Sequence, residues 1–175
     1  MKGDDSVGGI VGINETTGQL INCRFQGTVT GEHYVGGIAG LARATIRNCY
    51  VKCSLSGNDY VGGVAGASEE NTVVSGCYSL VEIAEDGRYT GAVCGTETGE
   101  FTGNFYVSDT LAGLGRISYA GKAEPITFET LVQTDGIPDR MTRFTRRFLA
   151  EGRRSSPTSS PMALPLGRRC SRRYR

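Results

Sequence analysis

The sequence contains no tryptophan, only one histidine and no stretch that approaches the roughly 20 apolar residues of a membrane-spanning helix. The missing apolar stretch argues against membrane insertion. A single histidine, His33, is too few for a metal site built from clustered Cys and His. The opening residues, MKGDDSVGG, lack the apolar segment of a secretory signal. We therefore expect either a lone cytosolic protein or a chain that begins in the middle of something larger.

Helical periodicity is also missing over most of the chain. Before Phe128, no segment places apolar residues at positions i, i+3, i+4 and i+7, so residues 1–122 are not expected to form helices. Only Phe128, Leu131 and Val132 could form a short helix, which Gly136 and a following proline would stop. The chain is therefore predicted to be all-β before this point.

What the chain does have is a glycine-rich heptad that recurs four times. The copies read SVGGIVG, YVGGIAG, YVGGVAG and YTGAVCG, and they begin at residues 6, 34, 60 and 89. Consecutive copies are thus 28, 26 and 29 residues apart. Recurrence at such a spacing indicates stacked repeat units and not one catalytic domain.

The similarity between units continues past the heptad. Asn22-Cys23 aligns with Asn48-Cys49, Gly76-Cys77 and Asn104-Phe105. Apolar residues then alternate with polar ones, and the aligned positions are Cys23, Phe25 and Val29 in the first unit and Cys49, Val51 and Leu55 in the second. This period of two predicts a strand with one buried face.

A single unit of this kind cannot bury its apolar face alone, whereas stacked copies can. Each unit is predicted to hold a short glycine-bearing strand, a turn, a longer alternating strand and another turn. The fold class is therefore all-β, a β-solenoid of about four repeats with about one repeat per coil. The glycines would mark a bend at the same height in every coil. Val35, Ile38, Val61 and Val64 would fill the thin interior.

The segment YVGGIAGLARATIRNCYVKCSLSG resembles the GLUG repeat family over its whole length. The resemblance covers about residues 1–110 and implies large secreted or surface-attached bacterial proteins. These include adhesin-like molecules and the non-catalytic parts of some IgA-specific metallo-endopeptidases. The fourth copy departs from the pattern, with Ala92 for glycine and Phe105 for cysteine, as expected of a terminal coil.

Three regions are predicted: solenoid repeats at 1–110, a capping or linker segment with a possible short helix at 111–150, and a disordered basic tail at 151–175. Residues 1–139 hold 8 Lys and Arg against 17 Asp and Glu, whereas residues 140–175 hold 11 Arg and one acid. Such an uneven distribution of charge indicates that the two segments differ in their physical properties or in their origin.

Both ends of the chain are expected to be cut. Met1 falls where the repeats place Val29 and Leu55, as though the chain started inside a preceding repeat. The codons of PMALPLG, shifted by one base, can encode a Tyr-Gly-Ala-Pro-Leu turn. A frameshift between about Gly152 and Pro161 is therefore a hypothesis for the arginine-rich end, which would make the chain a gene fragment.

Cysteine is the residue type in this chain with the widest range of possible chemical roles. Cys23, Cys49 and Cys77 share one repeat position and should stack as an inward column of small hydrophobes. Stacked thiols could also reach disulfide distance. Cys53 and Cys94 are expected to face the core, and Cys170 lies in the basic tail.

Three further features are candidates for a catalytic or binding site. His33, beside Glu32, is interpreted as a solvated turn residue without the partners that catalysis needs. Acidic turns recur at one corner and could hold Ca²⁺, although solvated acids are the simpler interpretation; they are Asp4-Asp5, Glu32, Asn58-Asp59 and Glu85-Asp86. The glycine heptads lack the Lys-Ser/Thr of a phosphate-binding loop. No catalytic, cofactor-binding or metal-binding residue is assigned, and no cofactor is expected.

The sequence therefore predicts a non-enzymatic structural and binding module of a bacterial cell-surface or secreted adhesin-like protein. Its partners would be host proteins or glycans bound on a solenoid face. One alternative is an accessory spacer of a secreted peptidase. Another is a nucleic-acid binder that uses the basic tail, although no specific nucleic acid is expected.

Overall fold

The computed structural model describes residues 1–84 and 87–133. The chain divides into two compact units, residues 1–136 and residues 137–175. The second unit lies outside the described residues, so the predictions about the tail at 151–175 and about a frameshift stay predictions.

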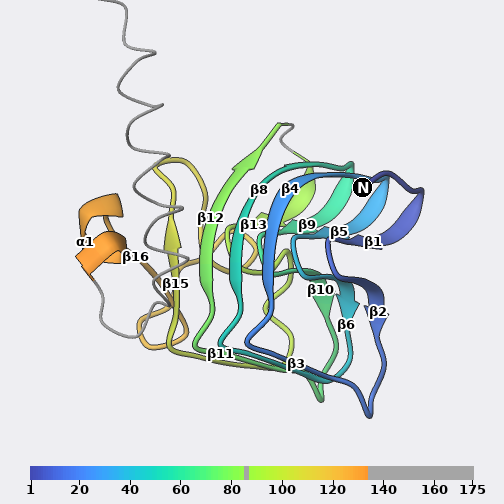
Figure 1. Ribbon diagram of the computed structural model, residues 1–175, viewed down its shortest axis with the longest axis horizontal. Coiled ribbons are helices and arrows are strands. Elements are labelled where there is room, and N and C mark those ends of the chain that lie inside the picture. Colours follow the sequence, from blue (N-terminus) through green and yellow to red (C-terminus); the bar gives the residue numbers. More distant parts are fainter. Residues whose placement is uncertain (85–86, 134–175) are drawn as a thin grey trace, which may run out of the picture. The chain divides into compact units, whose positions relative to one another are not determined.

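The described residues form coils of short strands (Figure 1). The first coil consists of β1 (Asp5–Gly8), β2 (Val11–Asn14), β3 (Gln19–Ile21) and β4 (Arg24–Thr30). The second consists of β5 (His33–Gly36), β6 (Ala39–Ala42), β7 (Thr45–Arg47) and β8 (Tyr50–Ser56). The third consists of β9 (Asp59–Gly62), β10 (Ala65–Ser68), β11 (Val73–Ser75) and β12 (Tyr78–Ile83). The fourth holds β13 (Arg88–Gly91), β14 (Glu100–Thr102) and β15 (Asn104–Val107), and it is followed by β16 (Ala123–Pro125) and α1 (Phe128–Gln133).

Corresponding strands of successive coils pair in parallel and in register. The sheets have the orders β1-β5-β9-β13, β10-β6-β2, β14-β11-β7-β3 and β16-β15-β12-β8-β4. Val7 pairs with Val35 and Val35 with Val61, so each repeat makes one coil. The predicted β-solenoid of about four repeats is confirmed.

The number of strands in a coil differs from the prediction. Two strands per unit were expected, whereas each of the first three coils has four. The unpredicted strands are short, as Ala39–Ala42 and Thr45–Arg47 illustrate with four and three residues. A strand of three or four residues shows too few alternations to give a period-two signal.

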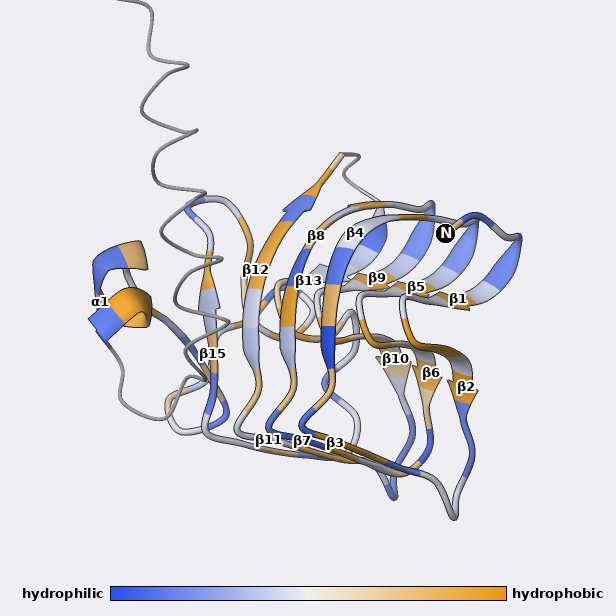
Figure 2. Ribbon diagram, viewed as in Figure 1, coloured by the Kyte–Doolittle hydropathy of each residue, from blue (hydrophilic) through white to orange (hydrophobic). Residues whose placement is uncertain are grey.

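The core runs through the centre of the coils. Val35, Ile38, Val61 and Val64, which the sequence placed inside, are all 0% exposed. Along β8, Val51, Cys53 and Leu55 are buried while Ser54 is exposed, which confirms the predicted alternation. Figure 2 shows apolar and polar residues alternating along the longer strands.

The paired glycines of the first three heptads lie where the chain turns between the first and second strands of the coil, as between β5 and β6. A Cβ on Gly36 would overlap the carbonyl oxygen of Ala39 in the same coil and approach the backbone of Gly66 in the next. Gly62 has the same surroundings, with Ala65 and Gly95. A side chain is therefore excluded at the first position of this bend, which explains why glycine recurs there in all four heptads.

A second corner of the coil uses the left-handed backbone region. Asn22, Asn48, Gly76 and Gly103 have φ values of 55°, 51°, 61° and 59°. Asn and Gly adopt this region more readily than other residues do. The strand register, in which Tyr78 pairs with Phe105, therefore matches Cys77 with Asn104. The predicted match of Cys77 with Phe105 was wrong by one residue, because Gly103 and not Asn104 fills the corner.

Candidate binding surface

The cysteines form the column that the sequence predicted, which we call the thiol column: Cys23, Cys49 and Cys77. Cys49 and Cys77 are buried, with 1% and 0% of their surface exposed, and Cys23 at the end of the stack is half-buried. Each thiol donates to the carbonyl oxygen two residues earlier, at 3.3 Å for Cys49 to Arg47 and 3.4 Å for Cys77 to Ser75. The thiols thus satisfy carbonyl groups at the left-handed corner.

The thiols also act on one another. A hydrogen bond from the Cys77 side chain lowers the pKa of Cys49 to about 7. The same hydrogen bond raises the pKa of Cys77. A thiolate is the nucleophilic form of cysteine, but a nucleophile must also be reached by its substrate. Because Cys49 is 1% exposed, the thiol column acts in packing and hydrogen bonding.

All five cysteines of the described region are free thiols. Cys53 and Cys94 are buried, as predicted, and Cys170 lies outside the described residues. Burial raises the pKa of Cys53 to about 12. In residues 1–84 and 87–133, no three His, Cys, Asp or Glu side chains gather closely enough to hold a metal ion.

His33 has a partner that sequence reasoning missed. Its Nδ1 lies 3.3 Å from Oδ2 of Asp59, in the next coil. Asp59 also accepts a hydrogen bond of 3.1 Å from Nε of Arg88, one coil further. The three residues occupy one register position in β5, β9 and β13. Each of the three residues stands just before the aromatic residue of its heptad. A comparison of the charges at that position in successive repeats would have revealed this ladder of paired side chains.

The corner where the acidic turns recur carries less negative charge than its sequence indicates. The backbone N–H of Glu32 donates to Asp4 and that of Asn58 donates to Glu32, both at 2.8 Å, so these turns do stack. Asp59, however, forms an ion pair with Arg88 and lies 3.3 Å from Nδ1 of His33. Exposed pairs of this kind add about 0–1 kcal/mol each and help to fix the register of the coils. The remaining acids of the corner, at 85–86, lie outside the described residues.

The aromatic residues that open the second, third and fourth heptads form a tyrosine column: Tyr34, Tyr60 and Tyr89. The ring centroids of Tyr34 and Tyr60 are 4.9 Å apart, and those of Tyr60 and Tyr89 are 4.7 Å apart. The interplanar angles are 13° and 7°, so the rings stack face to face along the solenoid. Their φ values of 53°, 56° and 60° are unusual for tyrosine, and ring stacking offsets part of that strain.

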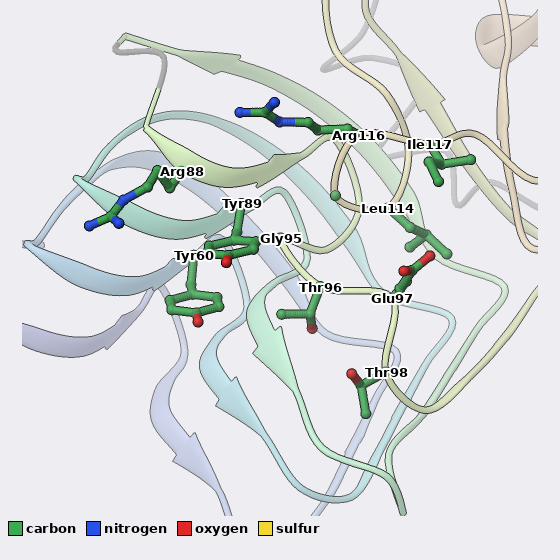
Figure 3. A pocket seen from close by; sticks show the side chains of 11 residues that line it. Tyr60, Arg88, Tyr89, Gly95, Thr96, Glu97, Thr98, Leu114, Arg116 and Ile117 are labelled. Atoms are coloured by element: carbon green, nitrogen blue, oxygen red, sulfur yellow. The ribbon is translucent and has the colours of Figure 1, made fainter.

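The tyrosine column ends in an open groove of about 670 Å³, which we call the Tyr89 groove (Figure 3). Tyr60, Arg88 and Tyr89 line one side, and the last residue of the fourth heptad together with residues beyond it line the rest. These are Gly95, Thr96, Glu97, Thr98, Leu114, Gly115, Arg116 and Ile117. The second group was not predicted, because residues 114–117 lie beyond the repeats.

Hydrogen bonds hold the far wall of the Tyr89 groove. The hydroxyl of Tyr119 donates to Oε2 of Glu97 at 2.8 Å, and the hydroxyls of Ser68 and Thr96 lie 2.9 Å apart. Leu114 and Ile117 exchange two backbone hydrogen bonds of 2.9 Å around a tight turn. The groove is therefore built on fixed backbone, although its mouth is open.

The glycine heptads themselves offer no anion site. The N–H of Gly37 donates to Gly63 at 3.0 Å, and the N–H of Gly63 donates to Gly91 at 3.2 Å. The backbone donors that a phosphate would need are thus used between coils. Within the described part of the chain, no helix is long and apolar enough to cross a membrane.

Comparison with known proteins supports the repeat assignment. Residues 3–30 match the family model described as the GLUG motif. This segment is the first coil, and the predicted resemblance to the GLUG repeat family is confirmed by this match. Searches of curated proteins and of solved structures gave no match. The chain is therefore a β-solenoid repeat module that carries a GLUG motif, a structural repeat type that is not catalytic in itself.

Proposed function

We propose that this chain is a non-enzymatic binding module from a bacterial cell-surface or secreted adhesin-like protein. The observation that carries the proposal is the in-register solenoid, in which every coil places its equivalent residues in straight columns. Such columns create long surfaces with a regular spacing, which suit extended partners such as host proteins or glycans.

The chemistry of the surface supports binding over catalysis. Several titratable side chains of the described coils pair with one another, as Asp59 does with His33 and Arg88. Arg43 likewise lies between two carboxylates, with Nε 2.9 Å from Glu69 and Nη1 3.3 Å from Glu15. Paired charges of this kind stabilise a stack of coils and leave no poised acid, base or nucleophile among them.

Nucleic acid is a weaker candidate than a protein or a glycan. The arginines on which that alternative depends lie at 140–175, outside the described residues. The described residues contain eight Lys and Arg against thirteen Asp and Glu, and an acidic surface repels phosphate.

The proposal is tested by display on the surface of a non-adherent bacterium. Cells carrying the chain are expected to adhere to immobilised mucin and to epithelial cells above cells carrying an empty display vector. A matched control displays the chain with Gly36→Ala and Gly62→Ala, which would disrupt the coils. Equal adhesion by cells with the intact chain, the control and the empty vector would overturn the proposal.

A further inference from the structure

The Tyr89 groove presents an aromatic face that is left open. Tyr60 is stacked on both sides, by Tyr34 and by Tyr89, whereas within the described region Tyr89 is stacked only by Tyr60. β13 is the last strand of its sheet in the described part of the chain, where no further coil covers Tyr89, and the residue is 52% exposed. A large aromatic side chain this exposed at a groove is a typical binding feature.

The groove also carries a positive charge that the described residues do not neutralise. Arg88 is held by Asp59 at 3.1 Å, and Glu97 is engaged by the hydroxyl of Tyr119. Arg116 is exposed and forms no ion pair or hydrogen bond with any side chain of residues 1–84 and 87–133. Figure 3 shows its guanidinium group reaching from the turn toward the side of the groove where Tyr89 lies.

These features fit one class of ligand. A sugar ring has an apolar face that can lie on the open ring of Tyr89, and its hydroxyls can bond to the polar wall formed by Thr96, Glu97 and Thr98. A carboxylate on the sugar would complement Arg116, whose planar guanidinium group matches a carboxylate with two hydrogen bonds. We propose that the Tyr89 groove binds an oligosaccharide that contains a carboxylated sugar.

A peptide fits the groove less well. The groove is open, so an alkyl side chain placed in it would keep much of its surface in water. A sugar needs only one face covered and keeps its hydroxyls hydrated. The volume of about 670 Å³ lies within the range of small-ligand sites.

This inference rests on the proposed binding role and is tested by calorimetric titration of the whole chain. The probes are a hyaluronan hexasaccharide and 3′-sialyllactose, whose sugars carry carboxylates of two kinds, with chitohexaose and lactose as neutral counterparts. At least one acidic probe is expected to bind, and its neutral counterpart about tenfold more weakly or not at all, because one charged hydrogen-bonded pair is worth about that factor. Failure of both acidic probes to bind, or equal binding of the neutral ones, would overturn the inference.

Variants locate the site. Arg116→Gln and Tyr89→Ala are each expected to weaken binding about tenfold, whereas Tyr89→Phe keeps the ring and should bind within about twofold of the original chain. Arg47→Gln removes an exposed arginine of β7 outside the groove and serves as the matched control. Circular dichroism checks that each variant folds; Arg116→Gln lies on an exposed turn, so it tests the site even where Tyr89→Ala does not fold.

The two proposals fail in different ways. Unchanged affinity in Arg116→Gln and in a folded Tyr89→Ala would place the sugar elsewhere and overturn this inference while adhesion still supports the binding role. Competition by an unrelated peptide at the groove would also overturn it. Loss of adhesion by displayed cells, with intact sugar binding in titration, would instead count against the surface role.

Discussion

The side-chain oxygen of Asn104 accepts a hydrogen bond of 3.0 Å from the backbone N–H of Cys77, one coil earlier. The amide nitrogen of Asn104 donates to the carbonyl groups of Val74 at 2.8 Å and of Lys122 at 3.0 Å. Asn104 is 0% exposed and takes the repeat position that cysteine holds in the preceding coils. An amide thus closes the thiol column and joins the last coil to the segment that follows.

Replacing Asn104 by alanine is expected to lower the free energy of unfolding by about 3 kcal/mol, because the buried N–H of Cys77 and the buried carbonyl of Val74 lose this partner. The carbonyl of Lys122 keeps the backbone N–H of Asn104. Urea denaturation followed by circular dichroism measures the change. Asn71→Ala is the matched control, since Asn71 is exposed in a turn and should change stability by less than about 0.5 kcal/mol. Equal effects of the two substitutions would contradict the role of Asn104.

The two kinds of glycine should respond differently to alanine. A Cβ on Gly62 would overlap the Ala65 carbonyl oxygen and lie 2.7 Å from the nitrogen of Gly95, so Gly62→Ala should cost more than about 3 kcal/mol. Gly103 has a φ of 59° but open space around a Cβ, so Gly103→Ala should cost only about 1 kcal/mol. Thermal melts of both variants provide the comparison. A larger loss in Gly103→Ala would show that backbone strain and not crowding governs these corners.

The thiols should differ in reactivity. In a Cys170→Ser background, a thiol reagent such as DTNB is expected to label Cys23 in the folded protein, because Cys23 is half-buried. Cys49, Cys53, Cys77 and Cys94 should react only on unfolding, because they are buried. Adding Cys23→Ser should remove the native-state labelling. Persistent labelling in that double variant would mean that the coils open more readily than the burial of these thiols implies.

Alkaline pH is expected to destabilise the fold through Cys53. Burial raises the pKa of Cys53 from its ordinary value of 9.0 to about 12, so the folded state holds the proton more tightly than the unfolded state does. This stabilisation is fully present below pH 9 and is lost as the pH rises toward 12. The loss is about 1.4 kcal/mol per pH unit.

Cys53→Ala should therefore flatten the decline of stability between pH 9 and pH 12, measured by urea denaturation at each pH. Ser54→Ala is the control, because Ser54 is exposed and does not titrate in this range. An unchanged slope in Cys53→Ala would show that the Cys53 thiol does not couple to folding.

Much of the fold could be read from the sequence because the repeat is regular. When copies of nearly equal length stack with parallel strands, equivalent residues fall into columns, so one alignment gives the register. This reasoning placed Val35 and Val61 in the core and predicted the column that contains Cys49 and Cys77. The same argument identified the heptad glycines as sites of close backbone approach, which the surroundings of Gly36 confirm.

The sequence by itself thus determined the solenoid, the coil length and the composition of the columns in the first three coils, because these depend on periodicity alone. Tertiary structure alone decided what lies between columns and beyond the repeats. It showed that Asp59 joins His33 to Arg88 and that Gly103, not Asn104, takes the corner. It also placed Arg116 and the exposed ring of Tyr89 on the lining of one groove. The reason is physical: the place of Arg116 depends on the path of the backbone after the last heptad, where no repeat exists to predict it.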